Sequence, residues 1–211
     1  MRDGICYIVG AGDCFGLDFS PAQPDYLIAA DGGLRHIEAC GLSADMVVGD
    51  FDSYVLPPPA HPNLHALQRE KDETDLFAAL QAGIRLHYRH FYLYCATGGR
   101  IDHTMANLQL LAYLSRRGLS GHLFDAHSVI TAITDGAHTF DAAYSGILSV
   151  FSADDQSFGV TATGLKYELA HTTLTNDFPL GISNEFIGAE SRISVERGTL
   201  LLVYPRLPHA H

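Results

Sequence analysis

Two carboxylates one residue apart, Asp50 and Asp52, are the most distinctive chemical feature of this sequence. They follow the apolar run Met46–Val48, which is typical of the end of a buried strand, after a single glycine, Gly49. Residues i and i+2 of an extended chain point to the same side, so both carboxylates are expected to converge on one point. Close anions repel unless a proton or a cation lies between them, and Mg²⁺ favours carboxylates together with substrate phosphates. The pair therefore predicts a magnesium site, while a polar turn explains these few residues equally well.

Similar acidic and glycine-rich turns follow other short apolar runs of the chain. The candidate acids at strand ends are Asp31, Asp50, Asp52, Asp72, Asp75 and Asp102. Beside them are two cations and four glycines, Lys71, Arg100, Gly32, Gly33, Gly98 and Gly99. Carboxylates that hold Mg²⁺, cations that screen oxygens and exposed backbone amides that approach phosphate are the groups that phosphoryl-type transfer needs.

Each of these groups also has a simpler structural explanation. Asp72 and Thr74 are candidate caps of a helix, and Lys71 taken alone is a solvated charge. Gly98-Gly99 can be a tight turn. Arg100 is the most suggestive single residue, because a guanidinium beside two glycines offers a fork of donors that suits a phosphate group.

Two common nucleotide-binding signatures are missing from the sequence. No Walker A motif is present, and Gly10-Ala11-Gly12 lacks the full dinucleotide fingerprint. An ordinary P-loop kinase and a dehydrogenase are therefore disfavoured.

The elements that must position these groups alternate between strand and helix up to about residue 120. Continuous apolar runs predict strands at 5–9, 26–30, 46–48, 64–67 and 91–96. Helical periodicity predicts helices over 34–40, 76–84 and 108–114. This alternation is typical of a parallel, Rossmann-like α/β sheet, in which ligands gather at the carboxyl ends of the strands. Each acidic turn named above lies at such an end, which favours a site over a set of unrelated turns.

The sequence changes in character after about Gly121. Short runs rich in β-branched and aromatic residues recur, separated by turns such as Asp135-Gly136 and Arg197-Gly198, and no stretch keeps a helical period. This pattern predicts an antiparallel all-β sandwich or barrel of about 90 residues, of which we take the sandwich. We therefore expect an α/β domain over residues 1–120, followed by an all-β C-terminal domain over residues 121–211.

Composition narrows the choice of partners and compartment. The chain has 211 residues, 47% of them hydrophobic, and a formal net charge of −11, so nucleic acid and anionic membranes are poor partners. The cysteines form no C-x-x-C pair and are predicted to be small buried hydrophobes rather than disulfides or zinc ligands; they are Cys6, Cys14, Cys40 and Cys95. With no basic-then-apolar leader and no apolar run of about 18 residues or more, we expect a cytoplasmic protein.

The motifs occur in an order that resembles the thiamine pyrophosphokinase (thiamin diphosphokinase) family. The resemblance rests on six blocks, Ala30–Gly33, Gly49–Ser53, Lys71–Asp75, Gly98–His103, Gly164–Leu169 and Gly181–Phe186. Any one block is a weak signal, but six blocks in order over nearly the whole chain form a strong one.

The resemblance implies an activity and an assembly that the spacing of residues does not show. Members of the family transfer a pyrophosphoryl group from ATP to the hydroxyethyl oxygen of thiamine, giving thiamine diphosphate and AMP. A homodimer is implied as well, with sites between the α/β domain of one subunit, which binds ATP and Mg²⁺, and the thiamine-binding β domain of the other.

The resemblance also assigns roles to residues. The Mg²⁺ ligands are expected to be Asp50, Asp52 and Asp75, which act in catalysis together with Arg100 and Asp102. The ATP-binding residues are expected to be Asp31, Gly32, Gly33, Lys71, Asp72, Thr74, Gly98, Gly99 and Arg100. The thiamine-binding residues are expected to be Ser183, Asn184 and Phe186.

One departure from the family pattern concerns the vitamin. Some relatives place a tryptophan against the thiamine rings, and this chain has none. Phe186 or Tyr167 is expected to offer an aromatic face to the cationic thiazolium instead. The general base stays open between Asp102 and another carboxylate. A Mg²⁺-dependent phosphohydrolase and a non-catalytic thiamine or nucleotide sensor are the alternative functions.

Overall fold

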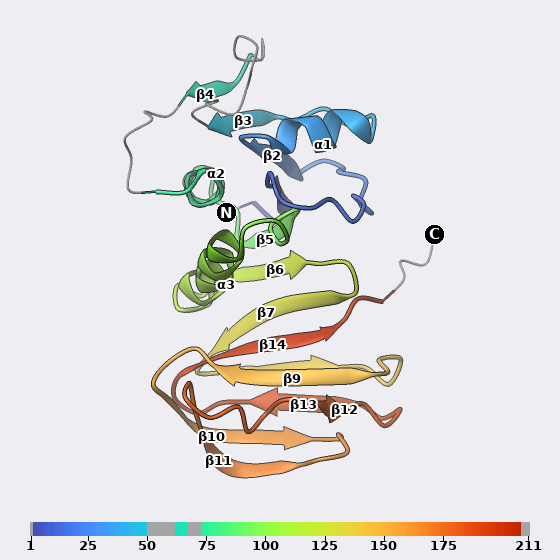
Figure 1. Ribbon diagram of the computed structural model, residues 1–211, viewed down its shortest axis with the longest axis vertical. Helices are drawn as coiled ribbons and strands as arrows, with labels where there is room; N and C mark the ends of the chain where they lie inside the picture. Colours follow the sequence, from blue (N-terminus) through green and yellow to red (C-terminus); the bar gives the residue numbers. More distant parts are fainter. Residues whose placement is uncertain (1, 50–61, 67–72, 208–211) are drawn as a thin grey trace. The chain divides into compact units, whose positions relative to one another are not determined.

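The computed structural model describes residues 2–49, 62–66 and 73–207 of the chain (Figure 1). Contacts divide the chain into two compact units. The first unit comprises Met1–Asn107 and Leu123–Asp125, and the second comprises Leu108–His122 and Ala126–His211. The expected division into domains 1–120 and 121–211 stays a prediction.

The first unit is built on a parallel sheet with the order β5-β1-β2-β3-β4. Its strands are β1 (Ile5–Val9), β2 (Tyr26–Ala30), β3 (Met46–Gly49), β4 (Leu64–Ala66) and β5 (His90–Tyr94). The first three are almost wholly buried, as expected of parallel strands that are covered on both faces. The strands predicted from the apolar runs are therefore confirmed.

Two helices, α1 (Gly33–Ala39) and α2 (Asp75–Arg85), belong to this unit, and α3 (Ile101–Ser115) begins in it and continues into the second unit. Thr74 caps α2 as predicted, because its side-chain oxygen accepts a hydrogen bond from the Phe77 backbone amide at 3.2 Å. A side chain at Gly83 would meet Cys6 and Phe91 at less than van der Waals distance, so glycine allows α2 to pack tightly onto β1 and β5.

The order of the strands reverses between β1 and β5. The chain passes from β1 through β2 and β3 to β4 on one side, and after α2 it places β5 on the other side of β1. The two strands are in parallel register, with Val9 opposite Tyr94. The loops that follow β1 and β5 therefore leave the same edge side by side, where open α/β sheets bind ligands.

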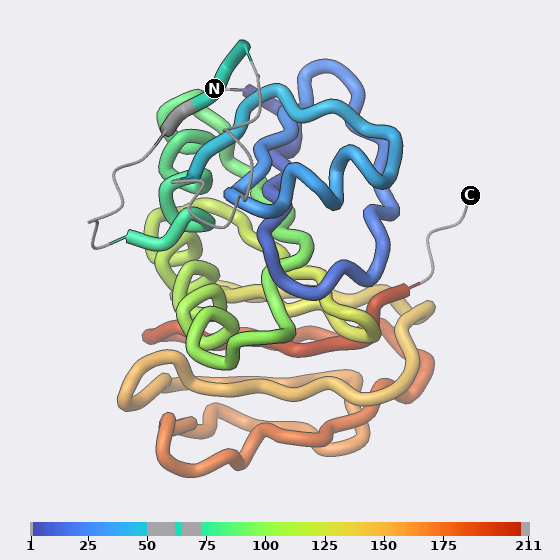
Figure 2. Tube along the Cα trace, turned by 45° about the horizontal axis from the view of Figure 1, so that its top comes forward, coloured from blue at the N-terminus to red at the C-terminus, as the bar shows by residue number. Residues whose placement is uncertain are grey.

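The second unit contains two four-stranded sets of antiparallel strands. One has the order β12-β9-β14-β7, formed by Asn184–Glu185, Ile147–Ser152, Thr199–Pro205 and Ser128–Thr134. The other has the order β11-β10-β13-β8, formed by Leu169–Thr175, Gln156–Thr163, Ser191–Ser194 and Ala137–Phe140. β14 lies between β7 and β9 in both views (Figures 1 and 2). β6 (Ser120–Phe124) crosses the boundary between the two units.

An aromatic cluster holds the two antiparallel sets together. Phe140 on β8 is 1% exposed, and its ring centre lies 4.9 Å from that of Tyr204 on β14. The rings of Phe186 and Tyr144 each lie 5.2 Å from Phe140. Edge-to-face contacts of this kind add to the stabilisation from burial. The separate antiparallel β unit expected from the sequence is thus present, alongside the parallel sheet.

Three strands of the second unit were not predicted, namely β8, β11 and β12. β11 has one buried residue among seven, and β8 has one among four, so neither shows the apolar alternation that marks a half-buried strand. In the described part of the chain, no helix is long and apolar enough to cross a bilayer.

The cysteines differ in part from expectation. Cys6 and Cys95 are buried as predicted, and burial raises the pKa of the Cys6 thiol. Cys14 and Cys40 are exposed, which makes the prediction of small buried hydrophobes wrong for these two. Both lie just after an element has ended, Cys14 after β1 and Cys40 after α1, where a side chain is less covered than inside a buried strand.

Replacing Phe140 by alanine should lower the free energy of unfolding by about 3–5 kcal/mol, because the substitution empties the centre of the aromatic cluster. Phe178→Ala is the matched control, since Phe178 is 64% exposed, and it should change stability by no more than about 0.5 kcal/mol. Urea denaturation followed by circular dichroism measures both. Equal losses in the two variants would contradict the assignment of the core.

Candidate active site

The loops after β1 and β5 continue the pairing of the two strands beyond their ends. The Gly12 amide donates to the Cys95 carbonyl at 2.8 Å, and the Asp13 amide donates to the Thr97 carbonyl at 2.9 Å. The two loops therefore form one joined rim at the carboxyl edge of the sheet. This rim contains the predicted phosphate residues Gly98 and Gly99.

Glycine is required in this rim for two reasons. A side chain at Gly12 would collide with the Thr97 carbonyl, and one at Gly98 would collide with Asp13. Gly98 and Gly99 also have φ values of +82° and +59°, which side chains disfavour. Asp13 was not among the residues predicted from the sequence, although an acid that follows a glycine-rich turn after a buried strand is the same signal as at the other strand ends.

Two hydrogen bonds, one buried and one part-buried, fix the start of the loop that follows β5. Thr97 Oγ1 donates to an Asp125 carboxylate oxygen at 2.5 Å. Asn107, which is 7% exposed on α3, donates from Nδ2 to the Ala96 carbonyl at 2.7 Å. These two hydrogen bonds fix the positions of Ala96 and Thr97, and therefore also the point at which the Gly98-Gly99 turn begins.

Arg100 and Asp102 pair with each other in a two-pronged ion pair. Arg100 Nε and Nη2 donate to the two Asp102 carboxylate oxygens at 3.2 and 2.5 Å. This hydrogen bonding lowers the pKa of Asp102 and raises the pKa of Arg100. Both side chains are more than half exposed, so the pair is worth little to stability and can open toward an incoming phosphate. The predicted pair is thus adjacent, but Asp102 is a weaker base than an ordinary carboxylate.

Asp31, Gly32 and Gly33 turn the chain from β2 into α1. Asp31 is 8% exposed and has φ +47°, and its amide donates to the Val48 carbonyl at 2.8 Å. A side chain at Gly33 would overlap the Val9 carbonyl. The predicted nucleotide-side turn therefore lies directly against the end of β1.

Of the three expected metal ligands, the structure describes Asp75. Asp75 is the first residue of α2 and is half-buried, in the first turn, where the helix dipole favours an acid. Asp50, Asp52, Lys71 and Asp72 lie outside the described residues.

The two predicted vitamin-side motifs are joined through Asn184. Its Nδ2 donates to the Tyr167 carbonyl at 2.6 Å, and its Oδ1 accepts from the Tyr167 amide at 3.0 Å. Asn184 is 7% exposed, so its side chain serves as a strut between the motifs. The neighbouring Ser183 has φ +60°, and its amide donates to the Ser149 hydroxyl at 3.1 Å.

The two candidate aromatics differ in accessibility. Phe186 is 6% exposed and packs against Phe140 and Tyr144 in the aromatic cluster. Tyr167 is 59% exposed, and the Lys166 amine lies 5.7 Å from its ring centre. An accessible ring face is therefore available on Tyr167 and not on Phe186.

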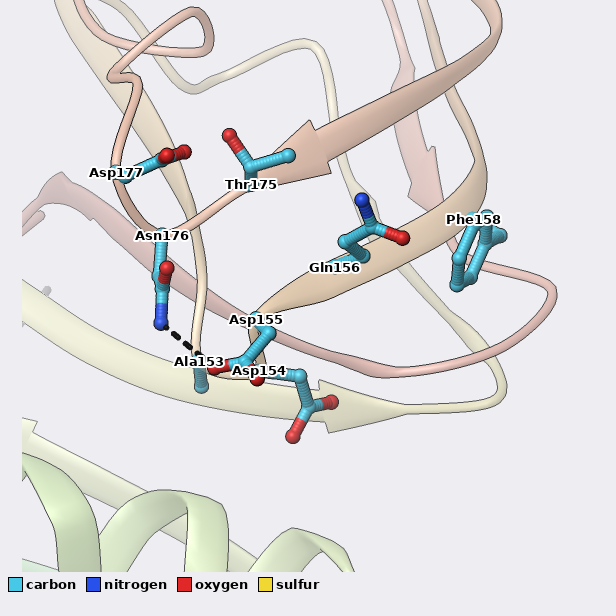
Figure 3. Close-up of a pocket in the computed structure, with 8 residues that line it drawn as sticks. All are labelled: Ala153, Asp154, Asp155, Gln156, Phe158, Thr175, Asn176 and Asp177. Atoms are coloured by element: carbon cyan, nitrogen blue, oxygen red, sulfur yellow. Dashed lines mark hydrogen bonds between the residues drawn. The ribbon is translucent and has the colours of Figure 1, made fainter.

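A separate hollow of about 940 Å³ opens on the second unit (Figure 3). Its lining residues are Ala153, Asp154, Asp155, Gln156, Phe158, Thr175, Asn176 and Asp177. Asp154 pairs with Arg116 at 2.5 Å, and Asn176 donates to Asp155 at 3.3 Å. Ser183, Asn184 and Phe186, all within the described chain, do not line this hollow, which carries no motif identified in the sequence.

Comparison with protein families matches both halves of the chain to one family. The thiamin pyrophosphokinase catalytic domain matches residues 21–120, and the thiamin pyrophosphokinase vitamin B1 binding domain matches residues 137–200. The chain belongs to the thiamine pyrophosphokinase family. Membership assigns it the activity of a diphosphotransferase and disfavours the sensor and phosphohydrolase alternatives.

Individual thiamine pyrophosphokinases agree with this assignment. The enzyme of Bacillus subtilis is 29% identical over 182 residues, which cover 83% of this chain and 85% of that protein. The crystal structure of the Geobacillus thermodenitrificans protein has a TM-score of 0.82 and 29% identity, covering 98% of this chain and 100% of the other. The thiamin pyrophosphokinase structure from Candida albicans, at 14% identity, shares the fold with a TM-score of 0.79, covering 96% of this chain and 90% of the other.

Replacing Asn184 by alanine should lower the free energy of unfolding by about 1–3 kcal/mol, because the Tyr167 amide and carbonyl lose their partners in a part-buried site. Asn176→Ala is the matched control, since Asn176 is exposed and bonds only at the surface. Thermal unfolding of both variants tests the strut, and an Asn184→Ala variant as stable as the Asn176→Ala variant would rule it out.

Proposed function

We propose that this chain transfers the pyrophosphoryl group of ATP to the hydroxyethyl oxygen of thiamine at the carboxyl edge of its parallel sheet. The main support is the rim formed by the hydrogen-bonded loops after β1 and β5. In it, the Gly98-Gly99 turn, Arg100 and Asp102 come directly after Thr97, whose side chain is fixed by Asp125. The products are thiamine diphosphate and AMP.

The ATP phosphates lie against the rim in this proposal. The amides of Gly98 and Gly99 approach the triphosphate without a side chain in the way, and Arg100 exchanges one prong of its ion pair for phosphate oxygens. Asp31, Gly32 and Gly33 line the nucleotide side, while Lys71, Asp72 and Thr74 line the triphosphate. The reversal of strand order between β1 and β5 supports a Rossmann-like description, because such sheets bind nucleotides at that point.

Asp50, Asp52 and Asp75 are proposed to hold Mg²⁺. The donor set fits the ion, since the half-buried Asp75 offers carboxylate oxygen at the start of α2 and β3 ends at Gly49, directly before Asp50. Hard oxygen donors are the ligands that Mg²⁺ prefers. When bound, Mg²⁺ neutralises phosphate charge and draws electron density from the β-phosphorus.

The residues of the chain position the reactants for in-line displacement. The thiamine oxygen attacks the β-phosphorus, the bond to the α-phosphate oxygen breaks, and AMP leaves. Arg100 and Lys71 screen the oxygens that gain charge. The lowered pKa of Asp102 makes it a modest proton acceptor, which suffices because a loose transition state needs little base assistance.

Thiamine is proposed to bind near Ser183, Asn184 and Phe186. The accessible ring of Tyr167 supports a role for it as the aromatic face against the thiazolium, with buried Phe186 packing behind the site. Asn184 acts by holding the two motifs together.

The site is proposed to be completed in a homodimer. Four large side chains are each more than half exposed, namely Ile147, Tyr167, Ile182 and Ile187. Ile147 begins β9, Ile182 and Ile187 lie on either side of β12, and the Tyr167 amide is hydrogen-bonded to Asn184 of β12. β12 is an edge strand, so an apolar surface of this kind supports a second subunit covering it. The cytoplasmic location expected from the sequence remains part of the proposal.

The assay incubates the chain with Mg-ATP and measures AMP with and without thiamine. AMP should form only when thiamine is added. Asp52→Asn and Asp75→Asn should each lower kcat by about 100-fold or more without unfolding the chain. Asp177→Asn, on the separate hollow, should leave kcat unchanged.

AMP release without thiamine would favour the phosphohydrolase, and binding of both substrates without turnover would favour the sensor. Near-normal kcat of Asp75→Asn at saturating Mg²⁺ would count against its role as a metal ligand.

A further inference from the structure

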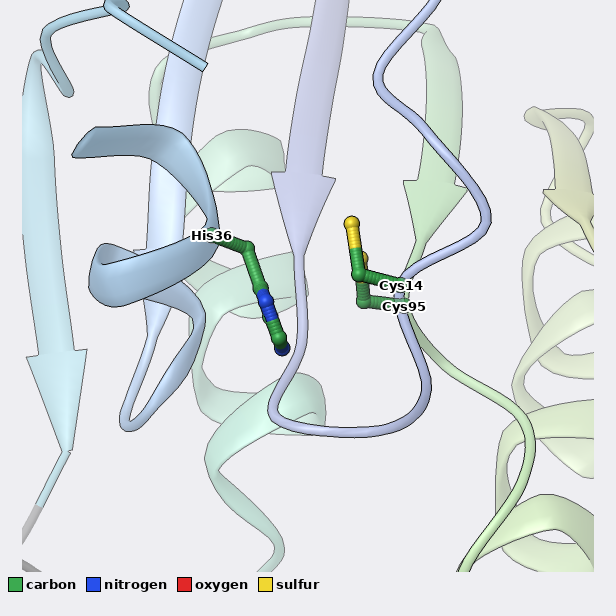
Figure 4. Close-up of side chains that lie close together, drawn as sticks. All are labelled: Cys14, His36 and Cys95. Carbon is green, nitrogen blue, oxygen red and sulfur yellow. The ribbon is translucent and has the colours of Figure 1, made fainter. Parts of the chain in front are cut away.

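Three potential metal ligands from separate elements of the first unit lie close together at the end of the parallel sheet (Figure 4). Cys14 is in the loop after β1, His36 is on α1, and Cys95 directly follows β5. Two sulfurs and one ring nitrogen, one atom from each side chain, lie within 4.8 Å of one another. None of these residues belongs to the proposed catalytic machinery.

The spacing of these atoms is close to that of a tetrahedral metal site. Zn–S bonds of about 2.3 Å and Zn–N bonds of about 2.0–2.1 Å place neighbouring ligand atoms about 3.4–3.8 Å apart. Closing the cluster from 4.8 Å therefore requires shifts of about 1 Å, which side-chain rotation can supply. Thiolate and imidazole ligands suit zinc and similar metals, whereas Mg²⁺ prefers oxygen.

A second observation concerns the orientation of the imidazole. His36 Nε2 lies 3.1 Å from the Gly12 carbonyl oxygen, so the protonated Nε2 donates to that oxygen and the lone pair is on Nδ1. Metal-bound histidines commonly donate their other ring N–H to a backbone carbonyl in this way, which fixes the tautomer and the ring direction.

Backbone hydrogen bonds also tie together the two segments that contain the cysteines. The Gly12 amide donates to the Cys95 carbonyl at 2.8 Å, which ties the loop that contains Cys14 to the end of β5. Cys95 is 4% exposed and has φ +51°, an uncommon conformation for a residue with a side chain.

We propose that Cys14, His36 and Cys95 form a three-ligand site for Zn²⁺, distinct from the oxygen-ligand Mg²⁺ site. On binding, the two thiols lose their protons to solvent, and two thiolates and a neutral imidazole coordinate the ion with no net charge. The fourth position is open to water, as in sites with three protein ligands. The expectation from the sequence that none of the cysteines binds zinc is replaced by this proposal.

Occupation of the site would tie together three elements that border the proposed nucleotide site. The β1 loop, α1 and the β5 loop all leave the same edge of the sheet. Bound metal would therefore restrain the rim without taking part in phosphoryl transfer.

The test uses the full-length chain, freed of metal and kept reduced, in excess Mg²⁺ so that oxygen sites are filled. Titration with Co²⁺ should produce thiolate-to-cobalt charge-transfer absorption that saturates at one ion per chain, and Zn²⁺ should displace the cobalt. Carboxylate-bound cobalt gives no such absorption, so this readout is independent of enzyme activity and of the catalytic metal.

Cys14→Ser and His36→Asn should each weaken Co²⁺ affinity at least about 10–100-fold, since even partners outside the ligand shell cost that much. Cys40→Ser is the matched control, because Cys40 is exposed and outside the cluster. The Co²⁺ affinity of this variant should equal that of the unaltered chain. Circular dichroism of the metal-free variants checks that each one folds.

Three results would overturn the proposal. The first is the absence of charge-transfer absorption at one cobalt ion per chain. The second is absorption of unchanged strength in both Cys14→Ser and His36→Asn. The third is a Cys14–Cys95 disulfide, found by mass spectrometry in the reduced sample, in place of bound metal.

Discussion

The parallel pairing of β1 with β5 is the constraint on which the first unit depends. With Val9 opposite Tyr94, the loops that follow must leave the sheet side by side, and their backbones continue to bond as far as Asp13 and Thr97. This closeness leaves no room for side chains at Gly12 and Gly98. The glycine-rich rim is therefore a packing requirement first, and its exposed amides become available to a phosphate as a consequence.

Charge balance is the second requirement at this edge. The chain carries a formal net charge of −11, and several acids follow the strands that end here. Arg100 is held by Asp102, so part of its charge is already balanced before any substrate arrives. Binding a polyphosphate in such surroundings calls for added positive charge, and this need is the physical reason for assigning Mg²⁺ to the acids in the proposed mechanism.

Much of the fold could be predicted because local patterns encode it. Buried parallel strands such as Ile5–Val9 and Tyr26–Ala30 are continuous apolar runs, and the Thr74 cap follows from residue type and position. β11 could not be predicted, because it has one buried residue among seven. Its place is set by pairing with β10, which local sequence does not record.

The candidate site shows the same division between local and long-range information. The turns that contain Asp31 and Arg100 were found from sequence, since acids and glycines after strands are a local signal. The packing of Asp13 against Gly98 and the meeting of Cys14 with Cys95 depend on which strands are neighbours. The sequence left the aromatic face toward the vitamin open between Phe186 and Tyr167, because a motif alone does not reveal which ring is buried. Phe186 packs in the aromatic cluster, whereas Tyr167 is 59% exposed.

A crystal structure with Mg²⁺, thiamine and a non-hydrolysable ATP analogue would decide where the substrates bind. Our expectation is that the triphosphate contacts the amides of Gly98 and Gly99 in the loop after β5, with Mg²⁺ bound to Asp75. A triphosphate seated in the hollow bordered by Asp154 and Asp177, or a metal ion bound away from Asp75, would contradict it.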